Sequence, residues 1–471
     1  MKIVKNYLYN TSYQLLALIL PLITGPYVSR VLGPGGVGIN SYTYNIANWF
    51  VLIGSIGVAL YGNQQIAYVR GDQEKVSISF WEILIMKTTT ICLAFIVFIT
   101  YVLTIGSYKQ YQLVQSVYII AAGMDISWFF MGLEDFRKTV LRNFFVKIVS
   151  LILILTLVKK ESDLLLYICI LAFATLIGNV TLWPFLKRQL VPIDWRNLHP
   201  FKHLAPAVAL FIPLAAIQIY TGLNKVMLGY FDTTTAAGFY DKSDTIVKMT
   251  LTIATSLGTV LMPHTAKIFG EGNDEKVRQL LYKSFSFITM ISVPLAFGLA
   301  AISLRFGGWF YGPGFGKVGF AMLLESFVII VIAWASITGN QYLVPTNQVK
   351  IYTHSVFAGA IVNIVLCLPL IHIWGLYGAM VSMVLAESTV TMYQILAIRR
   401  QISFSALFND FGKYLIAGLV MFVPVFYLNL RLKMNFLTLA IEVALGALLY
   451  VGAIFVLHPR TLDDVIKFVK R

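Results

Sequence analysis

Long apolar runs alternate with short polar stretches along almost the whole chain of 471 residues. A membrane-spanning helix needs about twenty mainly apolar residues. Read with that window, the chain predicts an all-α integral membrane protein with about fourteen transmembrane helices. The predicted spans are 6–31, 37–60, 78–104, 109–133, 136–158, 163–187, 202–229, 235–262, 277–304, 318–342, 352–372, 375–398, 410–430 and 435–457. Twelve is the alternative count, because 235–262 carries four charges and 109–133 begins with polar residues.

Basic residues are distributed unequally between the two sets of alternate loops. If the N-terminus is cytoplasmic, 23 of the 36 lysines and arginines lie at the cytoplasmic ends and loops, and 8 lie on the other side. Cytoplasmic loops of membrane proteins carry such an excess. The bias predicts an even number of spans with both termini in the cytoplasm. It also accounts for the net charge of +15 without a nucleic acid partner.

Weak internal similarity suggests that the spans form two related halves. The end of the sixth span, Val180–Trp183 before Lys187, is similar to the end of the twelfth, Val390–Tyr393 before Arg399. Parallel repeats are common in secondary transporters, with the substrate path between the halves. The predicted domains are an N-lobe of six helices (1–190), a linker (191–201), a C-lobe of six helices (202–400), two further helices (401–457) and a cytoplasmic tail (458–471).

The composition and the motifs argue against an enzyme. The chain is 58% hydrophobic and only 12% charged, so it needs lipid as its solvent. The short loops leave no room for a soluble catalytic domain, and no Walker, HExxH, GxSxG or CxxC motif occurs. Cys92, Cys169 and Cys367 lie inside apolar runs, which is typical of buried small hydrophobic residues. We therefore expect a transporter without a metal site.

Ionisable residues inside the spans are the candidates for substrate contact. Each costs at least about 2.5 kcal/mol at the bilayer centre if it faces lipid, so it should face a cavity or a partner. An excess of cations suits an anionic cargo such as a phosphate. The candidate substrate-binding residues are Arg30, Asp125, Lys147, Lys225, Lys242 and Lys248.

These candidates have alternative interpretations. Lys248 lies four residues after Asp244 and could simply pair with it. Arg30, Lys147 and Lys225 could sit at helix ends or pair between the lobes. Lys87, another intramembrane cation, could extend its charge to the cytoplasmic face.

Pro21, Gly25 and Pro26 lie within the first span. Proline removes a helix hydrogen bond and permits a bend. We expect this segment to act as a hinge during transport, and a static kink is the alternative.

Two stretches in the first third of the chain resemble the signatures of Wzx-type polysaccharide flippases. They are LPLITGPYVSRVLGPGGVG, from Leu20 to Gly38, and DISWFFMGLEDF, from Asp125 to Phe136. This family belongs to the multidrug/oligosaccharidyl-lipid/polysaccharide exporter superfamily. The clear resemblance covers about residues 1–190. It implies two lobes around a central cavity.

The resemblance also implies a cargo and a membrane. The cargo would be an undecaprenyl-diphosphate-linked oligosaccharide, which is moved by alternating access from the cytoplasmic to the outer leaflet for capsule, O-antigen or exopolysaccharide assembly. The protein would lie in the bacterial cytoplasmic membrane and could meet a polymerase of the same pathway. A related lipid II flippase suggests coupling to Na⁺ or H⁺ through the C-lobe. The candidate residues for coupling here are Asn363, Glu387 and Thr391.

Three other functions stay open at the level of sequence. A drug or metabolite exporter of the same superfamily would prefer a more apolar or acidic cavity. An intramembrane polymerase or ligase would need a large outer loop, and the outer loops here are short. A lipid scramblase would work without energy coupling.

Overall fold

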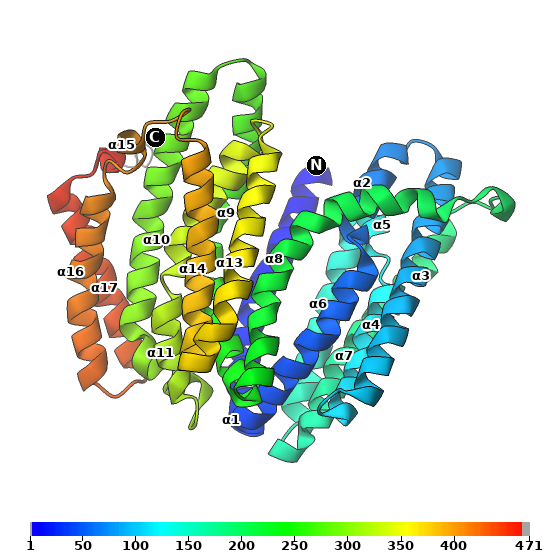
Figure 1. Ribbon diagram of the computed structural model, residues 1–471, viewed down its shortest axis with the longest axis horizontal. Coiled ribbons are helices and arrows are strands. Elements are labelled where there is room, and N and C mark those ends of the chain that lie inside the picture. Colours follow the sequence, from blue (N-terminus) through cyan, green and yellow to red (C-terminus); the bar gives the residue numbers. More distant parts are fainter. Residues whose placement is uncertain (1, 464–471) are drawn as a thin grey trace. The chain divides into compact units, whose positions relative to one another are not determined.

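The computed structural model describes residues 2–463, without the side chains of 2–18, 213, 214, 219, 220, 256–261 and 263. Within that part of the chain every regular element is a helix (Figure 1). The elements are α1 (Lys2–Ser55), α2 (Val58–Val69), α3 (Gln73–Thr104), α4 (Lys109–Met124), α5 (Ser127–Gly132), α6 (Phe136–Leu157), η1 (Glu161–Asp163), α7 (Leu164–Val180), η2 (Trp183–Arg188), η3 (Trp195–Asn197), η4 (Pro200–His203), α8 (Leu204–Phe231), α9 (Thr234–Gly270), α10 (Asp274–Tyr311), α11 (Gly316–Glu325), α12 (Val328–Ala335), η5 (Ser336–Leu343), α13 (Val349–Trp374), α14 (Leu376–Ala397), α15 (Phe404–Leu407), α16 (Phe411–Arg431) and α17 (Phe436–Leu457).

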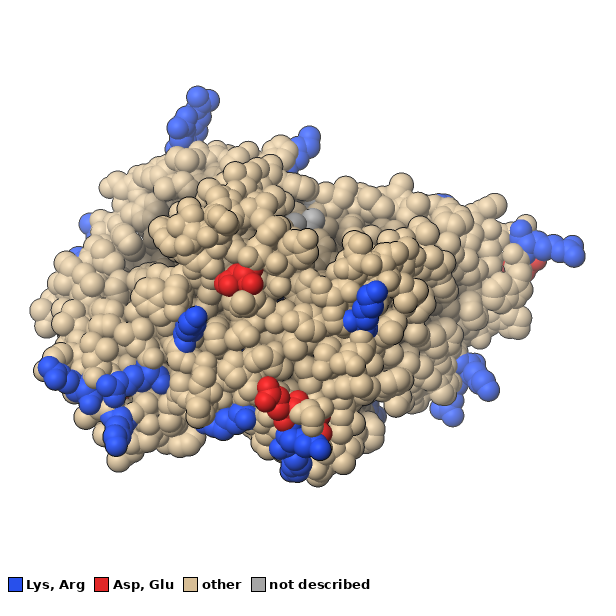
Figure 2. Space-filling model, turned by 60° about the horizontal axis from the view of Figure 1, so that its bottom comes forward, with Lys and Arg blue, Asp and Glu red and all other residues tan. Residues whose placement is uncertain are grey.

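The structure confirms an all-helical membrane protein. Among the described residues, eleven helices are long and apolar enough to cross a membrane, or twelve if the two halves of α8, bent by 51°, are one span. Fourteen would require that the stretch Ile19–Val69 crosses twice and that the charged helix α9 crosses as well. The exact count stays a prediction. Figure 2 shows one face on which most atoms belong to uncharged residues and the charged side chains are scattered.

The first two predicted spans form one long element, α1, which turns at a single residue. Only Gly33 has non-helical angles inside α1, with φ 65° and ψ 175°. This left-handed φ suits glycine, and Pro34 follows it directly. In Figure 1 the chain runs down in dark blue from the N-terminus, turns near the bottom of the view and rises again in brighter blue. The helix passes through Pro21 and Pro26 without a break, so the turn lies seven residues beyond the predicted hinge.

The predicted second span, 37–60, is wrong at its C-terminal end. α1 ends at Ser55, Ile56 and Gly57 both adopt positive φ, and α2 begins at Val58. The helix breaks here because Gly57 packs against α8. A Cβ at Gly57 would lie 3.0 Å from the side chain of Phe211 and 3.2 Å from the carbonyl oxygen of Ala207. The sequence around the break is apolar and contains no signal for the end of a helix other than glycine.

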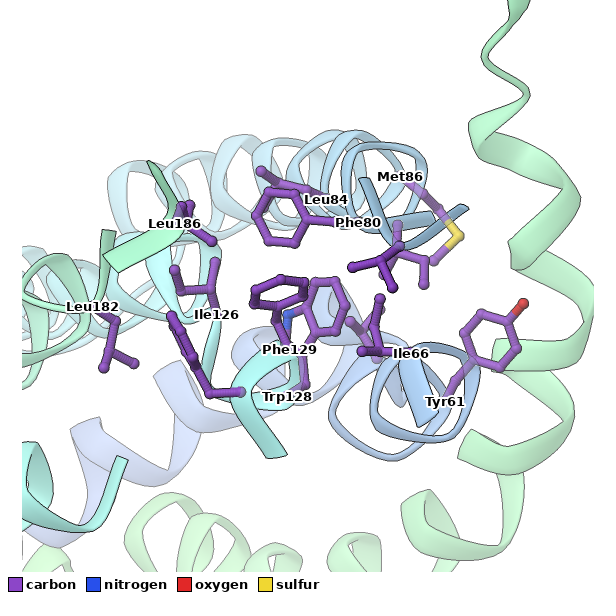
Figure 3. Close-up of a cluster of buried hydrophobic side chains, with 14 of the residues drawn as sticks. Tyr61, Ile66, Phe80, Leu84, Met86, Ile126, Trp128, Phe129, Leu182 and Leu186 are labelled. Atoms are coloured by element: carbon purple, nitrogen blue, oxygen red, sulfur yellow. The ribbon is translucent and has the colours of Figure 1, made fainter. Parts of the chain in front are cut away.

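The N-terminal half has a core of aromatic and aliphatic side chains, here named the aromatic core (Figure 3). Phe80 of α3 stacks on Trp128 of α5, with ring centroids 5.7 Å apart, and meets Phe129 edge to face at 4.8 Å. Gly62 lets α2 approach α5 closely, since a Cβ at this position would lie 2.5 Å from the Trp128 ring. Ala207 of α8 completes the cluster. The core therefore ties the start of α8 to α2, α3 and α5.

Residues 191–203, predicted in part as a linker, are fastened to α3. The backbone N–H of Val191 donates to Ser77 Oγ at 2.9 Å, and the ring of Trp195 packs against that of Trp81 with centroids 5.0 Å apart and the planes tilted by 54°. The carboxylate of Glu82, only 1% exposed, accepts from the His199 backbone N–H at 2.8 Å and from Lys202 and His203. The buried Glu82 carboxylate therefore fixes this part of the chain against α3, and residues 191–203 are not a flexible linker.

The C-terminal half is built around α10. The helix pair α16–α17 packs on it, and Tyr450 of α17 donates to the Met290 carbonyl oxygen at 2.8 Å. The predicted span 318–342 is divided into α11, α12 and the π-helix η5. Inside this region Thr338 donates to Gln394 Oε1 at 2.6 Å, and Gln341 donates to Ser284 Oγ at 2.8 Å. These buried polar partners accompany the change of helix type.

The chain forms two compact units, Met1–Gly229 and Tyr230–Arg471. The boundary between the two units therefore lies near the C-terminal end of α8. The sequence analysis placed the start of the second lobe at residue 202, before α8. The plan of six, six and two helices stays a prediction. Most of the predicted cytoplasmic tail, from residue 464 onward, lies outside the described residues.

Candidate functional site

A cavity of about 540 Å³ lies inside the N-terminal unit, between α1, α4, α6 and α7. Its wall follows helical periodicity, because residues 143, 147, 151 and 154 of α6 and residues 167, 171, 175 and 178 of α7 point into it. The remaining lining includes Leu20, Pro21, Thr24, Tyr44, Asn48, Val51, Tyr118, Ala122, Asp125, Arg142 and Asn179. We name this space the N-unit cavity.

Two predicted substrate-binding residues, Asp125 and Lys147, line the N-unit cavity together. Lys147 is a half-buried residue in the middle of α6. A lysine at this depth places a positive charge inside the membrane-spanning part of the unit, where the low dielectric strengthens its attraction for an anion. Pro21, one of the predicted hinge residues, also lines the cavity.

Asp125 stands at a break between two helices. α4 ends at Met124, and Asp125 adopts an extended conformation before α5 begins at Ser127. Its Oδ1 atom accepts from the Ser127 backbone N–H at 2.9 Å and from the Ser127 hydroxyl. The carboxylate therefore caps the start of α5 and leaves its charge at the cavity wall.

Lys87 is held beside this break, and the structure contradicts the idea that it extends to the cytoplasmic surface. Its residue is only 4% exposed, and Nζ donates to the Asp125 carbonyl oxygen at 2.7 Å. The break between α4 and α5 leaves that carbonyl without an acceptor role in a helix. Lys87 thus stabilises the position of the Asp125 backbone through this hydrogen bond.

Arg142 also lines the cavity, although it lies near the start of the predicted span 136–158 and was not among the candidate substrate-binding residues. Its guanidinium donates to the Asn179 side-chain oxygen and to Ser127 Oγ at 3.0 Å, and its Nη1 lies 3.8 Å from Asp125 Oδ1. The side chain is 12% exposed. The available signal was its position inside the predicted span 136–158, five residues before Lys147. The sequence could not show that α5 and α7 enclose Arg142, because these contacts come from other helices.

Polar and aromatic groups also contribute to the wall, beside aliphatic residues such as Leu151 and Leu171. Tyr44 and Tyr118 meet edge to face with centroids 5.2 Å apart, and Asn179 donates to the Ala121 carbonyl oxygen at 2.6 Å. Hydroxyls and amides can exchange hydrogen bonds with sugar hydroxyls, and aromatic faces can stack on sugar rings. The N-unit cavity therefore combines a cationic side, suited to phosphate, with a wall suited to carbohydrate.

The other predicted substrate-binding residues lie elsewhere. Arg30 is exposed near the end of the first limb of α1, and Lys225 is half-buried on α8. In the C-terminal unit, Lys248 of α9 forms an ion pair with Asp244 at 2.9 Å, which agrees with the local-pair interpretation. Lys242 of α9 lies 5.7 Å from the Tyr311 ring centroid. None of the four lines the N-unit cavity.

The three candidate coupling residues occupy two neighbouring helices. Asn363 of α13 is fully buried and its Nδ2 lies 3.5 Å from Ser382 Oγ of α14. Thr391, one turn after Glu387 on α14, donates to the Val331 carbonyl oxygen at 2.7 Å. Glu387 is 5% exposed. Among the described residues, no group of three or more His, Cys, Asp or Glu side chains is arranged to hold a metal ion.

Comparison with known proteins relates this chain to exporters of glycans. The sequence model described as "Polysaccharide biosynthesis protein" matches residues 3–269. A "Putative O-antigen transporter" of Escherichia coli (strain K12) is 22% identical over 412 residues, which cover 84% of this chain and 96% of that protein. A protein of the same description from Shigella dysenteriae is 23% identical over 391 residues, covering 81% of this chain and 96% of its own length.

Solved structures with the same fold come from two kinds of transporter. The inward closed conformation of the lipid II flippase MurJ has a TM-score of 0.74 at 14% identity, covering 98% of this chain and all of that one. An inward-facing multidrug MATE family transporter has a TM-score of 0.66 at 14% identity, covering 83% of this chain and 96% of that one. At this identity the likeness establishes the fold.

Proposed function

Because the chain belongs to the polysaccharide biosynthesis protein family, we propose that it is a flippase for lipid-linked oligosaccharides rather than an enzyme. The substrate is an undecaprenyl-diphosphate-linked oligosaccharide, moved from the cytoplasmic to the outer leaflet by alternating access. The product serves the assembly of O-antigen, capsule or exopolysaccharide. Relatives named as O-antigen transporters, matched over more than four-fifths of this chain, support this function.

The N-unit cavity is the single observation that carries the proposal. Its 540 Å³ is within the usual range of small-molecule sites and accommodates part of an oligosaccharide. Lys147 and Arg142 supply two cations on one helix, and tyrosines and amides line the same cavity. We assign the diphosphate to Lys147, with Arg142 held in place by Asp125, and the sugars to the polar wall. The prenyl chain stays in the lipid.

Arg30, Lys225, Lys242 and Lys248 keep a proposed role along the transport path outside the cavity. Pro21, Gly25 and Pro26 keep their proposed role as a hinge, since α1 contributes one wall of the cavity and a bend there would change its shape. Both assignments rest on the positions of these residues in spans or at span ends.

Substitution of Lys147 tests the main assignment. We expect Lys147→Gln to lower polymer production at least about tenfold in cells that lack their own flippase, because one charge-assisted contact to phosphate contributes about 1.5–3 kcal/mol. Lys147→Arg should retain most activity. Lys160→Gln, an exposed cation of the same unit, is the matched control. Full production by Lys147→Gln at normal protein level would refute the assignment of the diphosphate.

Export of drugs or metabolites is the second candidate function, because a multidrug transporter shares the fold. It predicts that export of the cargo continues in cells without the glycan pathway. Loss of polymer on deletion of this protein, together with unchanged drug tolerance, would exclude it.

We also propose a coupling cation, Na⁺ or H⁺, acting through Asn363, Glu387 and Thr391 in the C-terminal unit. All three side chains are buried and polar on the adjacent helices α13 and α14. A small cation there would balance the carboxylate of Glu387. Flipping in vesicles with and without imposed ion gradients tests this step, and equal rates would exclude coupling. The protein is proposed to lie in the bacterial cytoplasmic membrane with both termini in the cytoplasm, near the polymerase of its pathway.

A further inference from the structure

A second hollow, of about 610 Å³, opens on the N-terminal unit beside the first turns of α6. It is bounded on the other side by the C-terminal end of α7 and by η2. Its lining residues are Asp135, Arg137, Lys138, Leu141, Arg142, Phe145, Thr181, Leu182 and Phe185. We name it the lateral groove. Arg142 lines both this groove and the N-unit cavity, so the two spaces share one side chain as a wall.

The charges of the lateral groove favour an anion. Arg137 and Lys138 occupy the first turn of α6, and Arg142 follows about one turn later. The N-terminus of a helix carries a partial positive charge, so cations there are unfavourable unless an anion compensates them. Asp135 pairs with Lys138 at 2.9 Å. The groove still holds an excess of cations over carboxylates. It lies beside the first turn of α6, whose N–H groups have no acceptor within the helix.

The same groove presents apolar surface. Phe145 is 68% exposed, Leu141 49% and Phe185 44%. Lys138 lies over two aromatic rings, with Nζ 4.8 Å from the Phe130 centroid and 5.2 Å from that of Phe185. Arg137 and Lys138 stand in the first turn of α6, whereas Leu141 and Phe145 lie one and two turns further along it, with Arg142 between them. Phe185 of η2 lines the same groove. A ligand that matches this order has a phosphate head and a hydrocarbon chain.

We propose that the lateral groove binds the diphosphate head of the polyprenyl-linked substrate in the cytoplasmic leaflet before its sugars enter the N-unit cavity. This inference rests on the proposed function. A diphosphate carries more negative charge than the single phosphate of an ordinary lipid, which suits a site with three cations. Arg142, reached from both spaces, gives the head a continuous cationic surface from the groove to the cavity.

Photolabelling with a diphosphate lipid tests the proposal. The probe is farnesyl diphosphate that carries a benzophenone on its prenyl end, added to the full-length protein in lipid nanodiscs. We expect labelled peptides from the region 141–145 or 182–185. Arg137→Gln should lower the labelling there about tenfold, because it removes one charge-assisted contact. Arg188→Gln removes an exposed cation of η2 that does not line the groove and should leave labelling unchanged.

Competition identifies the ligand class. Undecaprenyl diphosphate should displace the probe from the groove, whereas phosphatidylglycerol at the same concentration should not. Equal displacement by phosphatidylglycerol, or labelling that is indifferent to Arg137→Gln while the protein keeps its melting temperature, would overturn the proposal.

Failure of the flippase function itself gives a different result. In that case undecaprenyl diphosphate would displace the probe from no site, and Lys147→Gln would leave polymer production unchanged. A wild-type flippase whose labelling occurs only around Lys147 would instead refute the lateral groove alone.

Discussion

Glu82 illustrates how one buried residue can organise a long stretch of chain. Oε2 lies 3.0 Å from His203 Nε2, and His203 Nδ1 lies 2.6 Å from the Tyr61 hydroxyl. Because an ionised carboxylate can only accept, His203 Nε2 carries the hydrogen, and in the neutral ring Nδ1 accepts from Tyr61. Lys202 and the His199 backbone N–H complete the set of donors. An acid inside a predicted span is here a structural acceptor.

We predict that Glu82→Ala destabilises the protein by about 3 kcal/mol, because it leaves buried donors without an acceptor. Glu82→Gln keeps one carbonyl acceptor and should cost less. The matched control is Glu74→Ala, which removes an exposed carboxylate from the same helix. Thermal unfolding of the purified variants in one detergent measures the effect. Equal melting temperatures for Glu82→Ala and Glu74→Ala would contradict the assignment.

At the scale of elements, the hairpin of α13 and α14 depends on close backbone approach. Gly375 forms the turn with φ 53°, and a Cβ at Gly378 would lie 1.9 Å from the Leu370 carbonyl oxygen. At Gly359, a Cβ would meet a side-chain atom of Val390 at 2.3 Å. The two helices are thus held together by small residues, which is the usual way to pack helices where water provides no driving force.

Gly378→Ala should therefore destabilise the C-terminal unit by about 1–3 kcal/mol, since the obstacle is backbone and cannot rotate away. Gly452→Ala, on α17, meets nothing within 4 Å and should be neutral or slightly stabilising. Melting temperature and the yield of monodisperse protein measure the difference. A Gly378→Ala variant as stable as Gly452→Ala would show that the hairpin can widen at no cost.

Sequence reasoning identified helices well and their internal breaks poorly. Length and hydropathy predict where chain crosses lipid, and the Gly33–Pro34 pair marks a turn by its own chemistry. The break at Ile56 and Gly57 and the π-helix at Ser336 depend on partners from distant helices, which no local pattern contains. The site shows the same division. Lys147 was predicted because it is an ionisable residue well inside a predicted span, whereas Arg142 was passed over because it lies near the start of that span.

At the scale of the whole molecule, the loop charges define an orientation that can be measured. In a variant with Cys92, Cys169 and Cys367 replaced by alanine, we expect Lys160→Cys to react with a membrane-impermeant maleimide added to intact cells. Arg196→Cys should react only after permeabilisation, because the positive-inside rule places its loop in the cytoplasm. Labelling of both positions from outside would contradict an even number of spans between the N-terminus and Arg196.

The fastening of residues 191–203 to α3 has a consequence for recombining halves of related proteins. A crossover at the predicted linker would join Glu82 of one parent to His199, Lys202 and His203 of another, and it would split the aromatic core at Ala207. A crossover at Gly229 and Tyr230 leaves both sets of partners within one parent. Chimeras of these proteins are therefore best built by exchanging a segment that contains α8 together with the N-terminal helices. The side chains that contact one another in this unit then come from the same parent.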